Sequence, residues 1–153
     1  MSKNWKELST AVKDGIISNA VKNGVDEKTI SFAMDLGQYL AEDERRYDER
    51  RRKEVTIREK LTTSQVRKFF GEVKRQQMIG YELSTFVLLK PKLAYAVGRS
   101  KSKENKIKDF YDVLSAAIDV VISEENNNNN QAFKNFIAIF EAIVAYHKLA
   151  ENS

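Results

Sequence analysis

The sequence predicts an all-α protein, a single-domain helical bundle of five or six helices, on three observations. The chain of 153 residues contains one proline and six glycines, fewer turn-forming residues than a multi-stranded sheet requires. Apolar residues recur at steps of three and four, the spacing of one face of an α-helix. Pairs of helix-capping residues precede two of these stretches. Because no internal repeat occurs, we expect one helical domain over residues 1–153.

Two helices are predicted in the N-terminal third of the chain. Asn4 and Glu7 resemble a capping box, and Gly24 ends the apolar stripe that follows. That stripe consists of Trp5, Leu8, Val12 and Ile16. Asp26 is the expected N-cap of the second helix. The apolar face of this helix is formed by Ile30, Ala33, Met34, Gly37 and Ala41. We expect it to continue through a charged tract to about Val55.

The middle of the chain predicts one helix followed by an interrupted one. Thr62 and Gln65 form a second capping box, and Gly80 closes the helix that it opens. The apolar stripe of this helix is Val66, Phe69, Phe70 and Val73. The next element, residues 81–99, contains the proline, which suits the first turn of a helix but not its interior. We therefore expect a turn at Lys90–Pro91 and a short helix that restarts there.

The two clearest helices lie at the C-terminal end. Apolar residues keep helical spacing from Ile107 to Val121 and again from Phe133 to His147, on either side of a polar loop at residues 126–130. The final helix is apolar over most of its circumference. This predicts that other helices, or a second copy of the protein, surround it.

The composition argues against an enzyme. The chain has no cysteine, which excludes disulfides, thiolate zinc sites and cysteine nucleophiles. His147 is the only histidine, and its place on the apolar stripe near the end of the last helix favours a structural role. The pairs Asp109–Asp112 and Glu124–Glu125 are expected on solvated helix faces, because no loop has the acidic pattern of a calcium site. No phosphate-binding glycine motif occurs, so we expect no cofactor, no metal and no catalytic residue.

The sequence resembles neither a membrane protein nor a secreted one. The N-terminus lacks the apolar block of a signal peptide, and no run reaches the roughly 18 apolar residues of a membrane span. We therefore expect a soluble protein of the cytoplasm.

Charge is distributed unevenly along the chain. Residues 45–103 hold 17 lysines and arginines against 6 acidic residues, a net charge of +11, whereas the segments before and after it carry −3 and −4. A basic centre between acidic ends predicts a polyanionic partner.

The densest run of charges, from Arg45 to Lys60, mixes both signs. Two pairs in and beside it, Glu42–Arg46 and Glu49–Lys53, have the i,i+4 spacing of ion pairs, which favours an exposed, salt-bridged helix. Such a helix would also leave three cations on one face, where phosphates could meet them: Arg46, Arg50 and Lys53. The role of this tract therefore stays open.

Two other basic surfaces have a more specific geometry. On the helix after Thr62, cations seven residues apart form two adjacent rows, Arg67 with Lys74 and Lys68 with Arg75. In the helix around Pro91, one face carries Lys92, Tyr95 and Arg99. An aromatic ring between two cations can stack on a base while the cations hold phosphates. The alternatives are a solvated basic face and a tyrosine of the core.

Two motifs carry a resemblance to a known family. The run LLKPKLAYAVGR, from Leu88 to Arg99, is preceded by LTTSQVRKFF, from Leu61 to Phe70. Together they resemble the small subunit of the type III-A CRISPR Csm effector complex, and their spacing, the chain length and the helical layout agree with it. Val97 stands where relatives often carry alanine, and the tract from Arg45 to Lys60 lies outside the resemblance.

The resemblance implies a helical-bundle protein without enzymatic activity, present in more than one copy, with the copies stacked head to tail. Such subunits line the channel that holds the guide RNA and its paired target RNA. A repeated backbone subunit cleaves the target RNA, and a large subunit acts on DNA and makes cyclic oligonucleotides. Partners would be these two subunits, both RNAs and further copies of the chain. Carried onto this sequence, the implied RNA-binding residues are Arg67, Lys68, Lys74, Arg75, Lys90, Lys92, Tyr95 and Arg99.

Two other functions fit the same residues. A helical assembly or scaffold protein could use the basic centre to dock an acidic protein partner, including the acidic ends of a neighbouring copy. A DNA-binding helix-turn-helix regulator would need polar residues where the helix after Thr62 carries Val66 and Phe69. The number of copies, and whether two copies exchange helices, stay open.

Overall fold

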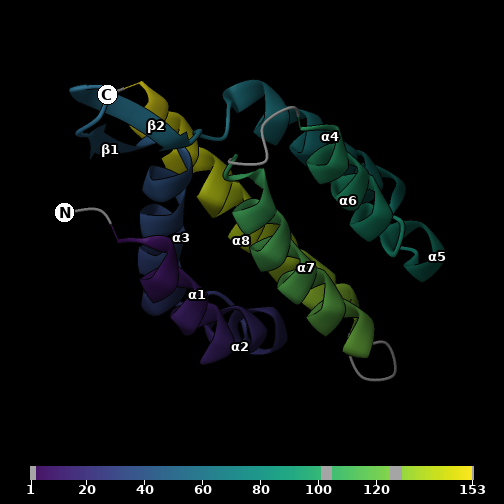
Figure 1. The fold of residues 1–153 in the computed structure, drawn as a ribbon. Helices are drawn as coiled ribbons and strands as arrows, with labels where there is room; N and C mark the ends of the chain where they lie inside the picture. Colours follow the sequence, from purple (N-terminus) through teal and green to yellow (C-terminus); the bar gives the residue numbers. More distant parts are fainter. Residues whose placement is uncertain (1–2, 101–104, 125–128, 153) are drawn as a thin grey trace.

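The computed structural model describes residues 3–100, 105–124 and 129–152 as a mostly helical protein with one small hairpin (Figure 1). The first half contains α1 (Trp5–Lys13), α2 (Ile16–Asn23), α3 (Glu27–Leu40), β1 (Glu44–Asp48) and β2 (Lys53–Arg58). The second half contains α4 (Thr63–Ile79), α5 (Leu83–Phe86), α6 (Leu89–Arg99), α7 (Ile107–Ser123) and α8 (Asn129–Glu151). The helical class is confirmed. The prediction of five or six helices without strands is wrong: the described residues hold more helices than that, and a two-stranded sheet.

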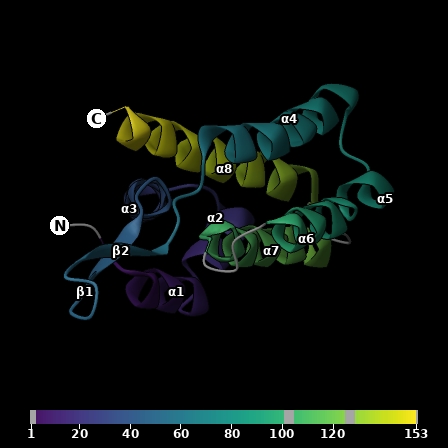
Figure 2. The same ribbon diagram turned by 45° about the horizontal axis from the view of Figure 1, so that its top comes forward.

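Helix α8 is the centre of the fold. Four other helices, α2, α3, α4 and α7, pack directly against it, as its apolar circumference predicts. Helix α6 packs on α7 instead. Figure 2 shows the result: α4 lies along α8, α6 lies along α7, and α5 joins α4 to α6 at one tip of the molecule.

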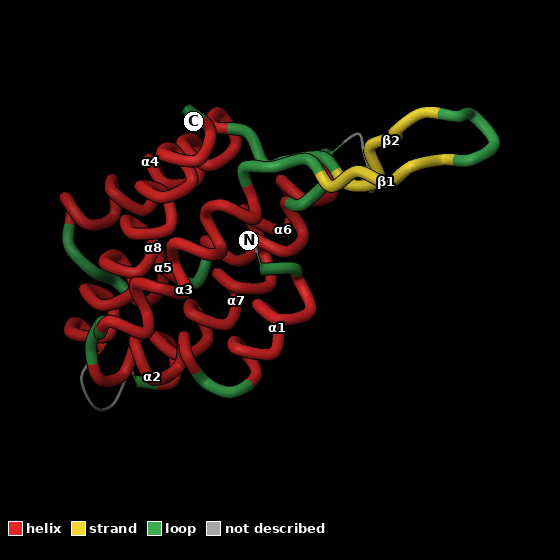
Figure 3. The backbone as a smooth tube through the Cα atoms, turned by 90° about the vertical axis from the view of Figure 1, so that its left-hand side faces the viewer, coloured by secondary structure: helices red, strands yellow, loops and turns green. Residues whose placement is uncertain are grey.

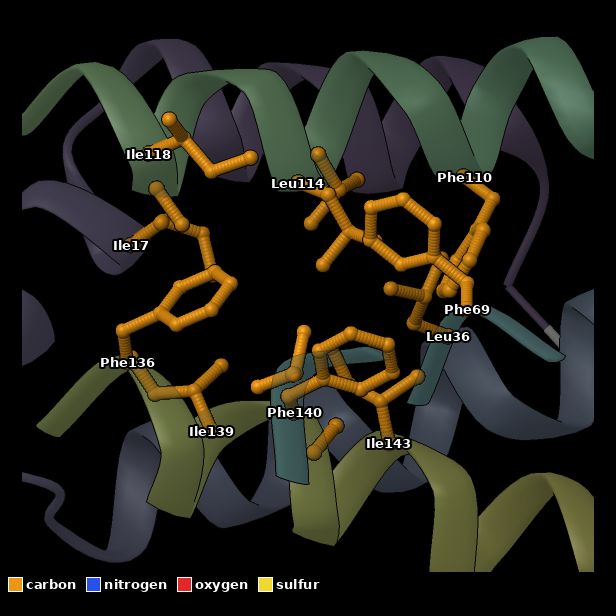
Figure 4. Packing of buried hydrophobic residues seen from close by; sticks show 14 of the residues in the cluster. Ile17, Leu36, Phe69, Phe110, Leu114, Ile118, Phe136, Ile139, Phe140 and Ile143 are labelled. Atoms are coloured by element: carbon orange, nitrogen blue, oxygen red, sulfur yellow. The ribbon is translucent and has the colours of Figure 1, made fainter. Parts of the chain in front are cut away.

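The core between these helices is rich in aromatic rings. Side chains of α7 and α8 point toward one another, among them Phe110 and Phe140 (Figure 4), whose ring centroids lie 5.8 Å apart in an edge-to-face arrangement. Phe69 of α4 stacks on Phe140 at 5.9 Å. One cluster of rings therefore fixes both α4 and α7 on the central helix.

Capping residues begin the helices where the sequence predicts. The Asp26 side chain accepts a hydrogen bond from the backbone N–H of Thr29 at the start of α3. The Thr62 hydroxyl accepts one from the Gln65 N–H at 3.2 Å, and the Gln65 side chain accepts one from the Thr62 N–H at 2.9 Å. Both predicted starts are confirmed, as is Gly80 at the end of α4.

Two helix boundaries differ from those predicted. The first predicted helix is two helices, α1 and α2, because Gly15 takes a left-handed conformation (φ 97°) between them and turns the chain. Pro91 does not begin α6 but occupies its third position, still in the first turn, where no helical partner exists for a backbone N–H. The interruption lies before it, between α5 and Leu89.

The prediction that the second helix continues to Val55 is wrong, because α3 ends at Leu40 and an antiparallel hairpin follows. The Asp48 carboxylate accepts hydrogen bonds from the backbone N–H groups of Arg50 (3.0 Å) and Arg51 (3.4 Å), which forms the turn. The β-branched run from Val55 to Ile57 favours a strand over a helix. Figure 3 shows the hairpin projecting away from the helices.

A buried polar network anchors the base of this hairpin. The Asp109 carboxylate accepts a hydrogen bond from the Tyr39 hydroxyl and forms an ion pair with Arg58 of β2, both at 2.6 Å. The Arg58 guanidinium also donates a hydrogen bond to the Tyr39 hydroxyl oxygen at 2.6 Å. The buried Lys106 ammonium donates to the carbonyls of Tyr39 (2.6 Å) and Glu42 (2.7 Å). Burial lowers the pKa of Lys106, and burial with the bond to Asp109 raises that of Tyr39. The prediction that Asp109 lies on a solvated face is wrong, since it is 4% exposed.

His147 is buried on the apolar side of α8, and one of its ring nitrogens lies 2.7 Å from the carbonyl oxygen of Leu61. It thereby ties the end of α8 to the segment that follows the hairpin.

Among the helices of the described residues, none has the length and apolar character needed to cross a membrane.

We predict that Gly37→Ala lowers the free energy of unfolding by about 1–3 kcal/mol, the usual cost of overpacking. A Cβ at Gly37 would lie 2.6 Å from the backbone nitrogen of His147, where α3 crosses α8. The control is Gly71→Ala on α4, where a Cβ meets nothing within 4 Å. That change should stabilise the protein by up to about 1 kcal/mol through helix propensity. Urea denaturation compares the two, and equal stabilities would contradict the close helix crossing.

Candidate nucleic-acid interface

A groove with a volume of 910 Å³ lies between α4 and α6. Its walls belong to helices that pack on different neighbours, α4 on α8 and α6 on α7, and they leave an opening between them. Phe69 and Ile107 lie at its apolar floor, and both are largely buried. The walls carry most of the polar side chains.

Five of the eight predicted RNA-binding residues line this groove. They are Lys68 and Arg75 on α4, and Lys92, Tyr95 and Arg99 on α6. Residues from two motifs that are separate in the sequence therefore face one shared opening.

The other three predicted residues do not line the groove. Lys74 forms an ion pair with Glu141 of α8 (2.9 Å), and Lys90 forms one with Asp119 of α7 (2.7 Å). Arg67 is exposed on α4 outside the groove lining. The two paired lysines connect the groove helices to the helices beneath them.

Glu72 connects the two walls of the groove. Its carboxylate accepts two hydrogen bonds from the Arg75 guanidinium, at 2.8 and 3.2 Å, and one from the Lys92 ammonium at 2.7 Å. Arg75 lies on α4, the same helix as Glu72, whereas Lys92 reaches across the groove from α6. The hydrogen bonds from Arg75 and Lys92 lower the pKa of Glu72 to about 2. Sequence reasoning missed this residue, because the pair with Lys92 depends on how far apart α4 and α6 stand.

Tyr95 is 68% exposed, which rules out the alternative of a core tyrosine. The Arg99 guanidinium lies 5.7 Å from the centroid of its ring, within the range of a cation–π contact. With the described residues, neither Arg99 nor Lys68 forms an ion pair. The groove therefore offers an open ring and two cations without an acidic partner.

The chemistry of the groove suits a polyanion with flat rings. Its lining holds Lys68, Arg75, Lys92 and Arg99 against a single acid, Glu72. Phosphates can pair with the cations while a base lies on the tyrosine. In the described part of the chain, no group of three or more histidines, aspartates and glutamates is arranged to hold a metal ion.

A family model supports an identity for the chain. The model of the Csm2 type III-A family matches residues 28–153, from the first turn of α3 to the C-terminal residue. The match includes the hairpin, both walls of the groove and the central helix α8, and it leaves out α1 and α2. Neither the curated proteins nor the solved structures contain a match to this chain.

We predict that Glu72→Gln destabilises the protein at neutral pH and that this effect fades in acid. The pKa of Glu72 is about 2 in the folded chain against an ordinary value of 4.5. The ionised carboxylate therefore stabilises the fold above its unfolded pKa, and this contribution is lost as the pH falls through the folded one. Urea titrations of both proteins from about pH 7 down to pH 2 measure the difference. A difference that stays constant over this range would show that the pKa is not depressed.

Proposed function

The chain belongs to the Csm2 type III-A family, the small subunits of type III-A CRISPR effector complexes. We propose that it holds RNA in such a complex through contacts with the phosphate backbone of the RNA. The site is the groove between α4 and α6. The observation that carries this proposal is the set of four cations around one exposed tyrosine, with a single acid among them. Guide RNA and its paired target are the ligands. The large subunit, the repeated backbone subunit and further copies of the chain are the neighbours.

The groove binds without reading sequence. Its cations are suited to phosphate oxygens, and contacts with phosphates fix the position of a strand but carry no base information. Stacking on Tyr95 is tolerant as well, because every base has a flat face. The lining contains no histidine, the side chain that most often transfers protons near neutral pH. The role of the subunit is therefore to bind and align RNA, and other subunits cut it.

An assembly function is the second candidate, and one observation favours it. The tip formed by the end of α4 and the start of α6 exposes three large apolar side chains: Met78 (87%), Ile79 (68%) and Leu88 (48%). Met78 and Ile79 are adjacent in the chain, and neighbouring exposed apolar residues are typical of contacts with proteins. This tip lies apart from the groove lining, so both functions can operate in one complex.

We predict that Lys92→Ala with Arg99→Ala weakens RNA binding to the same extent for unrelated sequences. Loss of two phosphate contacts should also reduce the slope of log K against log salt by about 1.4 on single-stranded RNA. The matched control is Lys74→Ala with Lys90→Ala, which removes the same charge from two cations outside the groove lining.

Fluorescence anisotropy with labelled oligonucleotides at several salt concentrations measures both quantities. An unchanged affinity and slope in the groove variant would contradict the proposed site. Equal effects in both double variants would mean that RNA responds to net charge and not to the groove. Light scattering of the free chain tests the assembly function in parallel. This function predicts oligomers of the chain and no change in the anisotropy of the labelled RNA.

We predict that Glu72→Gln tightens RNA binding several-fold, although it destabilises the fold at neutral pH. The change removes the carboxylate that competes with phosphates for Arg75 and Lys92, so phosphates bind these two cations more tightly. Glu82→Gln, an exposed change of the same charge outside the groove, is the control. The same anisotropy titration reports the result. Weaker binding by the Glu72 variant than by the control would mean that phosphates do not compete with this carboxylate.

A further inference from the structure

The β1–β2 hairpin carries a charged surface that the groove does not use. Six cations at and around its turn are exposed: Arg45, Arg46, Arg50, Arg51, Arg52 and Lys53. Arg45 pairs with Asp43 at 3.5 Å and Arg51 pairs with Asp48 at 3.6 Å. The other four form no ion pair with the residues that the structure describes. The hairpin thus holds these charges away from the body of the protein, in solvent (Figure 3).

A second hollow, of 840 Å³, leads from the groove to this hairpin. Three residues line both the groove and the hollow: Gln65, Arg99 and Ser100. The hollow continues past Lys60 to Thr56 on β2. The groove is therefore open at its Arg99 end, toward the hairpin.

The strand register decides which hairpin residues face this hollow. Thr56 pairs with Arg45 across the hairpin, and directly paired residues lie on the same face of a sheet. Tyr47 lies two residues further along β1 and shares that face, whereas Arg46 lies on the opposite one. The ion pair of Arg45 agrees, because its partner Asp43 also lines the hollow.

The face toward the hollow shares one feature with the groove, an exposed aromatic ring beside a cation. Tyr47 is 57% exposed and follows Arg45 at the spacing of one strand face, as exposed Tyr95 neighbours Arg99 in the groove. The acids on this side are Asp43 and Glu59 in the hollow and Glu54, which pairs directly with Tyr47 across the hairpin. Asp43 is already held by Arg45 and by the backbone N–H of Lys60 at 2.9 Å. An exposed ring beside a cation favours a nucleic-acid strand over an acidic protein surface, which offers the ring no base to stack on.

We propose that the hairpin extends the RNA path beyond the groove, so that a strand held between α4 and α6 continues past Arg99 and Lys60 onto β1. Arg45 contacts its phosphates there, and Tyr47 stacks on a base. This inference rests on the proposed function of the groove and adds a second site to it.

Two lengths of RNA separate the two sites. Helix α6 has 11 residues and is therefore roughly 16 Å long. An RNA of about 5 nucleotides spans this length and fills the groove alone, whereas an RNA of about 15 nucleotides also reaches the hairpin. Labelled oligouridylates of both lengths are titrated with wild type, with the hairpin variant (Arg45→Ala/Tyr47→Ala) and with the groove variant (Lys92→Ala/Arg99→Ala). Arg46→Ala removes one positive charge from the opposite face and is compared with Arg45→Ala alone. Circular dichroism melting verifies that every variant is folded.

We expect the hairpin variant to bind the long RNA roughly ten-fold more weakly and the short RNA unchanged. Arg46→Ala should affect the long RNA less than Arg45→Ala does. If the hairpin variant binds both lengths like wild type while the groove variant binds neither, the hairpin proposal is wrong and the groove stands. Failure of wild type to bind either length overturns both. If polyglutamate displaces the long RNA from wild type and no longer binds to the hairpin variant, the hairpin binds an acidic protein and not RNA.

Discussion

The packing of α8 is the constraint on which the rest of this structure depends. A helix that is apolar over most of its circumference needs neighbours on most sides, and α2, α3, α4 and α7 pack against it and leave one exposed row that contains Lys134, Ala138 and Glu141. The outer surface of α7 is then the position left for α6. Because α4 and α6 are held by two different helices, their facing sides stand apart. The groove is therefore a consequence of how the core is filled.

Whether a lysine or arginine of α4 and α6 holds helices together or is available to a ligand depends on the carboxylates near it. Lys74 and Lys90 lie over Glu141 and Asp119 and serve the packing of helices. In the groove, Glu72 is the one acid of the lining, and it leaves a surplus of positive charge beside an exposed ring. Ion pairs that hold helices in place and cations that stay available for a ligand thus occur on the same two helices, α4 and α6.

Local patterns predicted the parts of the structure that local forces determine. Helical spacing and capping residues identified α4, α7 and α8, and the i, i+3, i+7 spacing of Lys92, Tyr95 and Arg99 placed them on one face. The hairpin was missed because pairs at i,i+4 contribute only a few tenths of a kcal/mol. The ion pair that joins the hairpin to α7, between Arg58 and Asp109, spans 51 positions of the sequence, so no local spacing predicts it. The bridge at Glu72 and the second hollow depend on distances between helices, which no spacing within one helix contains.

The central claim is that RNA lies in the groove between α4 and α6, and photocrosslinking tests it most directly. RNA that carries a photoreactive thiouridine is bound to the full chain and irradiated, and mass spectrometry then locates the attached peptides. We expect crosslinks on Tyr95 and on the α4 and α6 residues that line the groove. Crosslinks confined to α1, α2 and the outer face of α3 would contradict it.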